Sequence, residues 1–212
     1  MIFGLPIGML QSNCYVVYDE HDKVGAIIDP GGKVEPLLDE IERRGITPRY
    51  LLNTHGHFDH IAANTPLTQR FELQVGLHPA DAELLARGGG ASWYNLAYIP
   101  APAPTLELTD GLELALGTLT LTVIHTPGHT PGSVCFYCPA DQALITGDTL
   151  FAGSVGRTDL PGGSAQALSA SLKRLLALPS ETQLYPGHGP VSTLAHERRH
   201  NPWLQRLPSS PQ

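Results

Sequence analysis

Residues 53–60 read Asn-Thr-His-Gly-His-Phe-Asp-His and directly follow the apolar segment Tyr50–Leu52. Three histidines and an aspartate within six residues have no ordinary structural use, because such groups are costly to bury together without partners. In an extended chain, residues two apart point to the same side, so His55 and His57 converge on one ion. Asp59 and His60 follow where a helix can start, and they point elsewhere. The segment therefore predicts two neighbouring metal sites with imidazole and carboxylate ligands.

Three further segments share one design, in which a glycine-containing turn at a strand end presents one ligand. They are Thr126-Pro127-Gly128-His129, Thr146-Gly147-Asp148 and Tyr185-Pro186-Gly187-His188-Gly189. Glycine permits a tight bend and a close approach of the backbone to an ion. Because strand-end loops are held by a rigid sheet, they suit a metal site of fixed geometry. We therefore add His129, Asp148 and His188 to the candidate ligands.

Between these motifs, short β-type segments recur and each is closed by Gly, Pro or Asp. We expect strands at residues 2–7, 13–18, 25–28, 50–52, 73–77, 106–108, 119–124, 133–137, 142–145 and 183–185. Apolar residues at helical spacing predict a helix from Val34 to Ile41 that stops at Gly45, and two more at 80–86 and 165–176. Helices in both halves among short strands indicate an α/β (α+β) fold, with helices packed outside two sheets.

Residues 88–104 show little periodicity and contain a run of three glycines together with Trp93, Tyr94 and Tyr98. Loops of this length are often functional. The adjacent aromatic residues favour a long surface loop that packs over another part of the molecule. A disordered connector is the alternative.

Composition narrows the function and the location. The chain has 212 residues, 42% of them hydrophobic, and a formal net charge of −7, which argues against a nonspecific nucleic-acid binder. Three cysteines cannot form a disulfide framework, and we expect Cys135 and Cys138 simply to lie on a strand. The first basic residue is Lys23, so no charged signal-peptide segment precedes the apolar start. We expect a cytoplasmic protein that binds neither nucleic acid nor membrane.

The order H-x-H-x-D-H, G-H, G-D and G-H, from His55 to His188, resembles the metallo-β-lactamase superfamily. Residues 126–133, 147–151 and 156–159 are similar to the type II glyoxalase (hydroxyacylglutathione hydrolase) branch, particularly its single-domain bacterial members. The resemblance implies a four-layer αββα sandwich that spans residues 1–212 as one domain. Only 24 residues follow His188, so the C-terminal helical glutathione-binding domain of longer relatives is expected to be absent.

The resemblance also implies a role for each ligand. Metal one is bound by His55, His57 and His129, metal two by Asp59, His60 and His188, and Asp148 bridges both. Zinc is the first expectation for these two divalent ions, with iron and manganese as alternatives. A bridging aspartate is not used by true metallo-β-lactamases, which argues against β-lactam hydrolysis as the main activity.

This site predicts a hydrolase that cleaves a small-molecule thioester, S-D-lactoylglutathione or a related hydroxyacylglutathione. Two ions about 3.5–4 Å apart can share and activate one water, and the bridging hydroxide is then the nucleophile, oriented by Asp59. Arg157 is the candidate substrate-binding residue, because the resemblance implies a contact with glutathione carboxylates. An ion pair with Asp159 is the equal alternative, and the missing helical domain makes a broader thioester range plausible.

Two other functions fit the same residues. Persulfide dioxygenases share this fold and the Gly-Arg-Thr-Asp sequence at 156–159, and there His55, His129 and Asp148 would bind a single Fe(II). A lactonase or another ester hydrolase would use the same two ions on a different electrophile. A non-catalytic metal-dependent binding module is a third class. The sequence does not predict the oligomeric state.

Overall fold

The computed structural model describes residues 1–97 and 99–207, and its first half is built on a six-stranded sheet. The strands, in their order across the sheet, are β1 (Ile2–Ile7), β2 (Ser12–Tyr18), β3 (Val24–Ile28), β4 (Thr47–Leu52), β5 (Gln74–Leu77) and β6 (Leu106–Glu107). The first three pair antiparallel, whereas β3 to β6 pair parallel. Parallel pairing brings the carboxyl ends of β3, β4 and β5 to one edge.

The second half contains another six-stranded sheet and a small hairpin. Its order is β14 (Ser192–Thr193), β13 (Gln183–Pro186), β10 (Ala143–Gly147), β9 (Val134–Cys138), β8 (Leu119–His125) and β7 (Glu113–Leu116). Only β10 and β13 pair parallel within this sheet. The hairpin consists of β11 (Leu150–Phe151) and β12 (Ser154–Val155).

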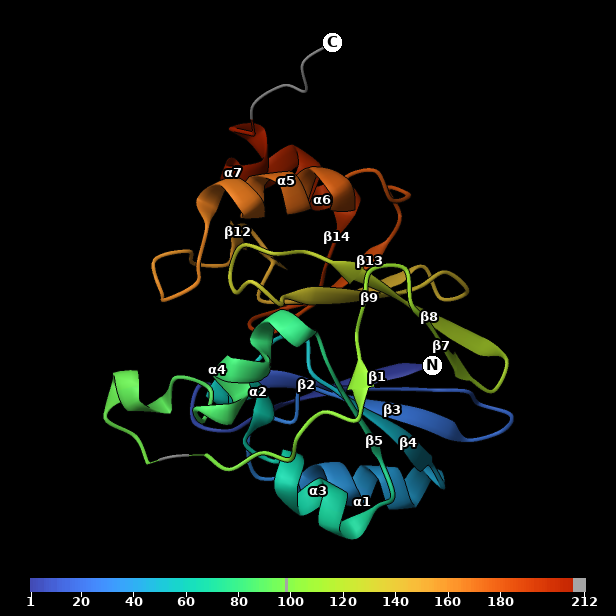
Figure 1. Cartoon of the computed structure of the whole chain (residues 1–212). Helices are drawn as coiled ribbons and strands as arrows, with labels where there is room; N and C mark the ends of the chain where they lie inside the picture. Colours follow the sequence, from blue (N-terminus) through green and yellow to red (C-terminus); the bar gives the residue numbers. More distant parts are fainter. Residues whose placement is uncertain (98, 208–212) are drawn as a thin grey trace.

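Helices cover the outer face of each sheet, as Figure 1 shows. The first half contains α1 (Glu35–Arg44), α2 (Phe58–Ile61), α3 (Asn64–Arg70), η1 (Pro79–Asp81), α4 (Ala82–Ala86) and η2 (Ala91–Tyr94). The second half contains α5 (Ala165–Leu175), α6 (Leu194–His200) and α7 (Pro202–Gln205). With α1 and α3 on one side and α5 to α7 on the other, the layers are α, β, β and α. The predicted four-layer αββα sandwich is confirmed.

The core is divided by these layers into three main clusters. Between the sheets, side chains such as Val17, Leu52 and Phe136 are fully buried. Leu37 and Ile41 of α1 pack on the outer face of the first sheet, and Gly45 ends this helix at φ +65°, as its sequence predicted. Leu168, Leu172 and Leu175 form the buried stripe of α5 on the other side.

The sequence did not lead us to expect β7, the hairpin, β14 or several of the short helices. β7 had a usable signal, because Leu114 and Leu116 alternate with exposed residues and are buried between the sheets. The other missed elements have two to seven residues, too few for periodicity to show. Cys135 and Cys138 lie on β9 as expected and are both free and buried, in different core clusters. Among the residues that the structure describes, no helix is long and apolar enough to cross a membrane.

Asp19 connects the two sheets at the end opposite to the predicted ligands. Its Oδ1 accepts hydrogen bonds from the backbone of His21 (2.7 Å) and Asp22 (3.0 Å), and its Oδ2 accepts one from the backbone N–H of Thr118 (2.8 Å) and one from the Thr118 hydroxyl. The Thr118 hydroxyl and these N–H groups hold the pKa of Asp19 well below its usual range. Because the folded pKa is depressed, this contribution to stability is present above the ordinary carboxyl pKa of about 4 and is lost as the pH falls.

We predict that Asp19→Asn lowers the melting temperature at pH 7 by a few degrees, because an amide cannot accept four hydrogen bonds. The difference from the wild type should shrink below about pH 4, where the wild-type carboxylate begins to lose its advantage. Thermal unfolding followed by circular dichroism between pH 3 and 8 measures both. Glu20→Gln, an exposed change in the same turn, is the matched control. Equal pH profiles for the two variants would contradict the prediction.

Candidate metal centre

The first four candidate ligands lie on the segment that connects β4 to α2. Asn53 begins this loop, and its buried amide donates to the carbonyl of His60 (3.0 Å). His57 is the N-cap residue of α2, so Asp59 and His60 lie in the first turn of a helix, as the sequence predicted. The loop thus changes direction between His57 and Asp59 and presents the two pairs of side chains to different points.

The other three ligands follow strands of the second sheet. His129 follows β8, Asp148 directly follows β10, and His188 follows β13. Glycine is required beside them for space, because a Cβ at Gly187 would lie 2.3 Å from Asp148 Oδ1. The carboxyl ends of strands from both sheets therefore meet at one edge of the sandwich.

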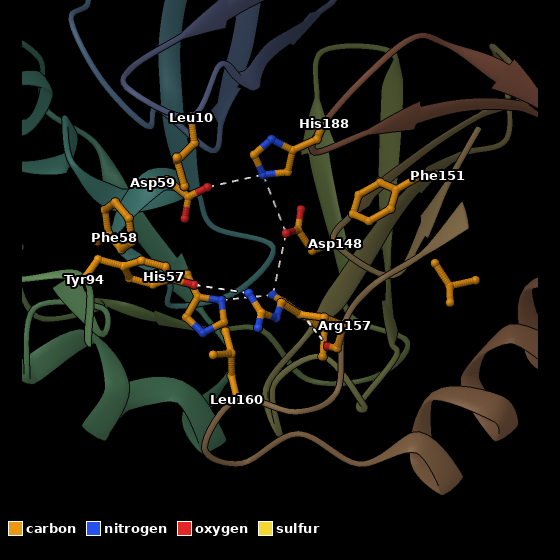
Figure 2. A pocket seen from close by; sticks show the side chains of 12 residues that line it. Leu10, His57, Phe58, Asp59, Tyr94, Asp148, Phe151, Arg157, Leu160 and His188 are labelled. Atoms are coloured by element: carbon orange, nitrogen blue, oxygen red, sulfur yellow. Dashed lines mark hydrogen bonds and ion pairs between the residues drawn. The ribbon is translucent and has the colours of Figure 1, made fainter. Parts of the chain in front are cut away.

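All seven candidate ligands converge there, as Figure 2 shows for those it labels. Three sets have donor atoms within 4.8 Å of one another, namely His55/His57/His129, His55/His60/Asp148 and Asp59/His60/His188. Asp148 lies between the outer two sets. Its Oδ1 is 3.4 Å from His60 Nε2, and its Oδ2 is 3.5 Å from His129 Nε2. His188 Nε2 lies 3.6 Å from Asp148 Oδ2 and 3.2 Å from Asp59 Oδ2.

Several donor atoms of the candidate ligands have no hydrogen-bond partner in the described part of the chain, as expected of atoms that bind metal ions. His55 Nε2, His60 Nε2 and Asp148 Oδ1 are buried without a hydrogen-bond partner among the described residues. Buried polar atoms without partners are rare and costly in folded proteins. In addition, His57 Nδ1 lies 2.9 Å from His129 Nε2, so two ring nitrogens face one another. Divalent ions would satisfy all of these atoms, and a set of five imidazoles and two carboxylates suits zinc, iron or manganese.

The charges at the centre are arranged in two halves. Burial and the neighbouring His129 lower the pKa of His57 to about 3, and burial followed by the adjacent imidazoles lowers the pKa of His55. These two rings are neutral near pH 7, so a cation need not displace a proton from them. Burial also opposes the protonation of His60, but the carboxylates of Asp59, Asp148 and Asp29 raise its pKa to about 10. Negative charge is therefore concentrated beside His60.

Two buried carboxylates that sequence analysis missed hold the ligand loops. Asp29 follows β3, and its oxygens accept from the backbone N–H (2.7 Å) and hydroxyl (2.6 Å) of Thr54 and lie 3.0 Å from His60 Nδ1. Asp81 follows β5 and accepts from the backbone N–H groups of Gly56 (2.9 Å) and Gly132 (2.7 Å). Asp29 is the first residue after β3, and Asp81 lies four residues after β5. An aspartate shortly after an apolar strand is the signal by which the sequence could have identified both.

Two other groups position individual ligands. Ser12 Oγ donates to Asp59 Oδ2 at 2.9 Å. His129 Nδ1 lies 2.8 Å from the carbonyl oxygen of Arg157, which accepts a hydrogen bond from the ring N–H. The other ring nitrogen, Nε2, then has a lone pair for a cation. The backbone at Arg157 therefore has a role that is independent of its side chain.

A cavity of about 360 Å³ opens in front of the ligands, and we call it the Arg157 pocket. Its walls include Leu10, Phe58, Tyr94, Phe151 and Arg157. The Arg157 guanidinium makes two 2.7 Å hydrogen bonds to Asp159 and one of 3.4 Å to the Tyr94 hydroxyl. The ion pair with Asp159 is therefore present, and Arg157 also lines the pocket in front of the candidate ligands (Figure 2), while its contact with a substrate stays a prediction.

The predicted surface loop does pack over the site. Trp93 of η2 lies edge-on to His57, with ring centres 5.9 Å apart, and Tyr94 lies 5.6 Å from the ring of Phe58. Gly89, at φ +66°, approaches α2 so closely that a Cβ there would lie 2.4 Å from the backbone N of Phe58. Tyr98, the third aromatic residue of this segment, lies outside the described residues.

Comparison with known proteins relates this geometry to a family. The model of the metallo-beta-lactamase superfamily matches residues 7–188. Hydroxyacylglutathione hydrolase GloC of Haemophilus influenzae is 36% identical over 94% of this chain and 96% of its own length.

Two solved structures are similar along nearly their whole length. BLEG-1, described as a B3 metallo-beta-lactamase, is 40% identical with a TM-score of 0.90, and the match covers 96% of this chain and 99% of BLEG-1. TTHA1623, solved in a di-iron-bound form, is 45% identical with a TM-score of 0.86, and the match covers 95% of this chain and all of that one.

We predict that Asp81→Asn weakens metal binding about 10- to 100-fold. The carboxylate accepts hydrogen bonds from both the His55–His57 loop and the His129 loop, and an amide, which has a single acceptor oxygen, cannot keep all of them. Competition with a coloured chelator measures the affinity. Asp39→Asn, on the exposed face of α1, is the control. Unchanged affinity in Asp81→Asn would show that the loops keep their positions without this carboxylate.

Proposed function

The chain belongs to the metallo-β-lactamase superfamily, and from this premise we propose that it is a metal-dependent thioesterase that acts on hydroxyacylglutathiones such as S-D-lactoylglutathione. The observation that supports this most directly is Asp148, whose two oxygens face His60 on one side and His129 on the other. A carboxylate in that position suits a pair of cations. Full-length similarity to a hydroxyacylglutathione hydrolase supports the substrate class.

In this proposal His55, His57 and His129 hold the first cation, Asp59, His60 and His188 hold the second, and Asp148 contacts both. When bound, the two cations supply Lewis-acid polarisation of a carbonyl and lower the pKa of water toward neutrality. Asp59 orients the attacking water. Its carboxylate is suited to this because Ser12 donates to Oδ2 at 2.9 Å and so limits rotation of the side chain.

The chemistry of the pocket favours a thioester over an amide. Besides the candidate ligands and Arg157, the walls of the Arg157 pocket are mainly apolar, with Leu10, Phe58, Phe151 and Leu160 among them. An amine must be protonated as it leaves, whereas a thiol, with a pKa of about 8.5, departs as a thiolate. A site whose walls offer few proton donors therefore suits a thiolate leaving group.

Two alternative activities should be assayed together with thioester hydrolysis. Similarity to BLEG-1 is a reason to assay β-lactams as substrates, although the position of Asp148 between the two ligand sets argues against them as the main substrate. The persulfide dioxygenase interpretation requires one iron, and the similarity to the di-iron-bound TTHA1623 shows that iron itself does not distinguish the two. The number of ions and the reaction must be measured together.

We predict about two divalent ions per chain, thioester hydrolysis with S-D-lactoylglutathione, and loss of at least about 100-fold in kcat/KM after Asp59→Asn. Elemental analysis, thiol release and oxygen uptake with glutathione persulfide provide the measurements, with a chromogenic cephalosporin as the β-lactam. Asp39→Asn is again the control. One iron with persulfide-dependent oxygen uptake, or β-lactam cleavage without thioester cleavage, would overturn the proposal.

For Arg157→Gln we predict a KM about two- to tenfold higher for glutathione thioesters with little change in kcat, because the guanidinium binds the thiol half equally in the ground and transition states. A thioester of an uncharged thiol should be unaffected. Arg87→Gln removes a comparable exposed ion pair, with Glu83, and is the control. Equal effects on both thioesters would show that Arg157 acts only through Asp159.

A further inference from the structure

A second cavity adjoins the candidate metal centre on the side of the first sheet. It measures about 550 Å³ and is larger than the Arg157 pocket. We call it the Met9 groove. Its walls come from the turn after β1, the loop after β3, the end of α2 and the segment after η2.

The groove and the Arg157 pocket lie on either side of the start of α2. Phe58 and Asp59 line both cavities, whereas the other residues of the two walls differ. The β1–β2 turn contributes to both walls, with Met9 in the groove and Leu10 in the Arg157 pocket. The two cavities therefore adjoin one another at Phe58 and Asp59, where the first turn of α2 begins.

The two directions differ in chemistry. The Arg157 pocket contains a guanidinium, which suits a charged group. The groove is lined by the apolar side chains of Met9, Ala62, Leu96 and Ile99, and besides Asp59 its one charged residue is the exposed Lys33. Met9 is 72% exposed although it is fully apolar, and exposed apolar walls around a concave surface are typical of ligand sites.

The shape of the groove is determined by the backbone. Gly8, at φ +77°, lies so close to Gly32 that a Cβ on Gly32 would be 2.2 Å from the Cα of Gly8. The two loops therefore meet backbone to backbone, without side chains between them. Opposite, Ile99 packs against the buried cluster of Ile61, Leu77 and Leu85, and Thr65 donates to the carbonyl of Pro100 at 2.8 Å. The wall is thus attached to the core.

From these observations we infer that the Met9 groove binds the acyl half of the thioester, so that straight apolar acyl chains gain affinity as they lengthen into it. This inference rests on the proposed thioesterase function. A thioester has two halves that diverge from the scissile carbonyl, and the site has two cavities that share Phe58 and Asp59. The charged thiol half fits the side of Arg157, and the apolar chain fits the groove.

The test is a series of acetyl, butanoyl, hexanoyl and octanoyl thioesters of glutathione. For the wild type, kcat/KM should rise by about two- to fourfold per methylene, up to the chain length that fills the groove. Ala62→Leu narrows the groove and should reduce the octanoyl-to-acetyl ratio at least fivefold. Met9→Ser, at a largely exposed position, should reduce the octanoyl-to-acetyl ratio by a smaller factor. This variant replaces Ala62→Leu in the test if Ala62→Leu does not fold. Ala170→Leu, on the exposed face of α5, makes the same change far from the groove and should leave the ratio as it is.

Binding of the straight-chain carboxylates from acetate to octanoate, followed by calorimetry on the metal-loaded protein, separates the two proposals. If no thioester is cleaved but affinity for carboxylates rises with chain length and falls in Ala62→Leu, the groove inference stands and the thioesterase proposal fails. If thioesters are cleaved but neither rate nor affinity depends on chain length, the groove inference fails alone. Dependence on chain length that is equal in wild type and Ala62→Leu also overturns it, because the chain then binds elsewhere.

Discussion

The structure depends on one constraint, which is that donor atoms from two separate sheets must lie within a few ångströms of one another to form a metal-binding cluster. Asp148 shows this most clearly, because it follows a strand of the second sheet and faces His60 from the first. A shift of one sheet against the other by even an ångström would separate these atoms. The inter-sheet core, with fully buried residues such as Phe136 and Leu52, therefore serves the site as well as stability.

Buried carboxylates transmit this constraint to the ligand loops. Asp29 directly follows β3 and Asp81 is the last residue of η1, after β5, and each accepts hydrogen bonds from a ligand-bearing loop. Asp81 also reaches the loop of His129 through Gly132, so one carboxylate positions ligands from both sheets. A carboxylate that accepts several backbone N–H bonds favours a single arrangement, because each bond is lost if the loop moves.

The position of α2 determines how the two cavities are arranged around Asp59. Because this short helix carries Asp59 and begins at Phe58, it stands between the Arg157 pocket and the Met9 groove. In the proposed thioesterase, Asp59 is common to both cavities, while each half of the substrate would meet a different set of walls. Members of one family that keep the ligands can then differ in substrate by changing only these loops.

The sequence by itself indicated α1, α5 and helices outside two sheets, because these depend on local spacing such as leucines three and four apart. The seven candidate ligands came from a histidine-rich segment and three glycine turns, and the four-layer sandwich from the family resemblance. It did not predict β7, the roles of Asp29 and Asp81, or the Met9 groove. Only the tertiary structure decided which donors face one another and which carboxylates support them. The physical reason is that these contacts join residues distant in the chain, such as Asp81 and Gly132, and strand order, which no local pattern encodes, sets their separation.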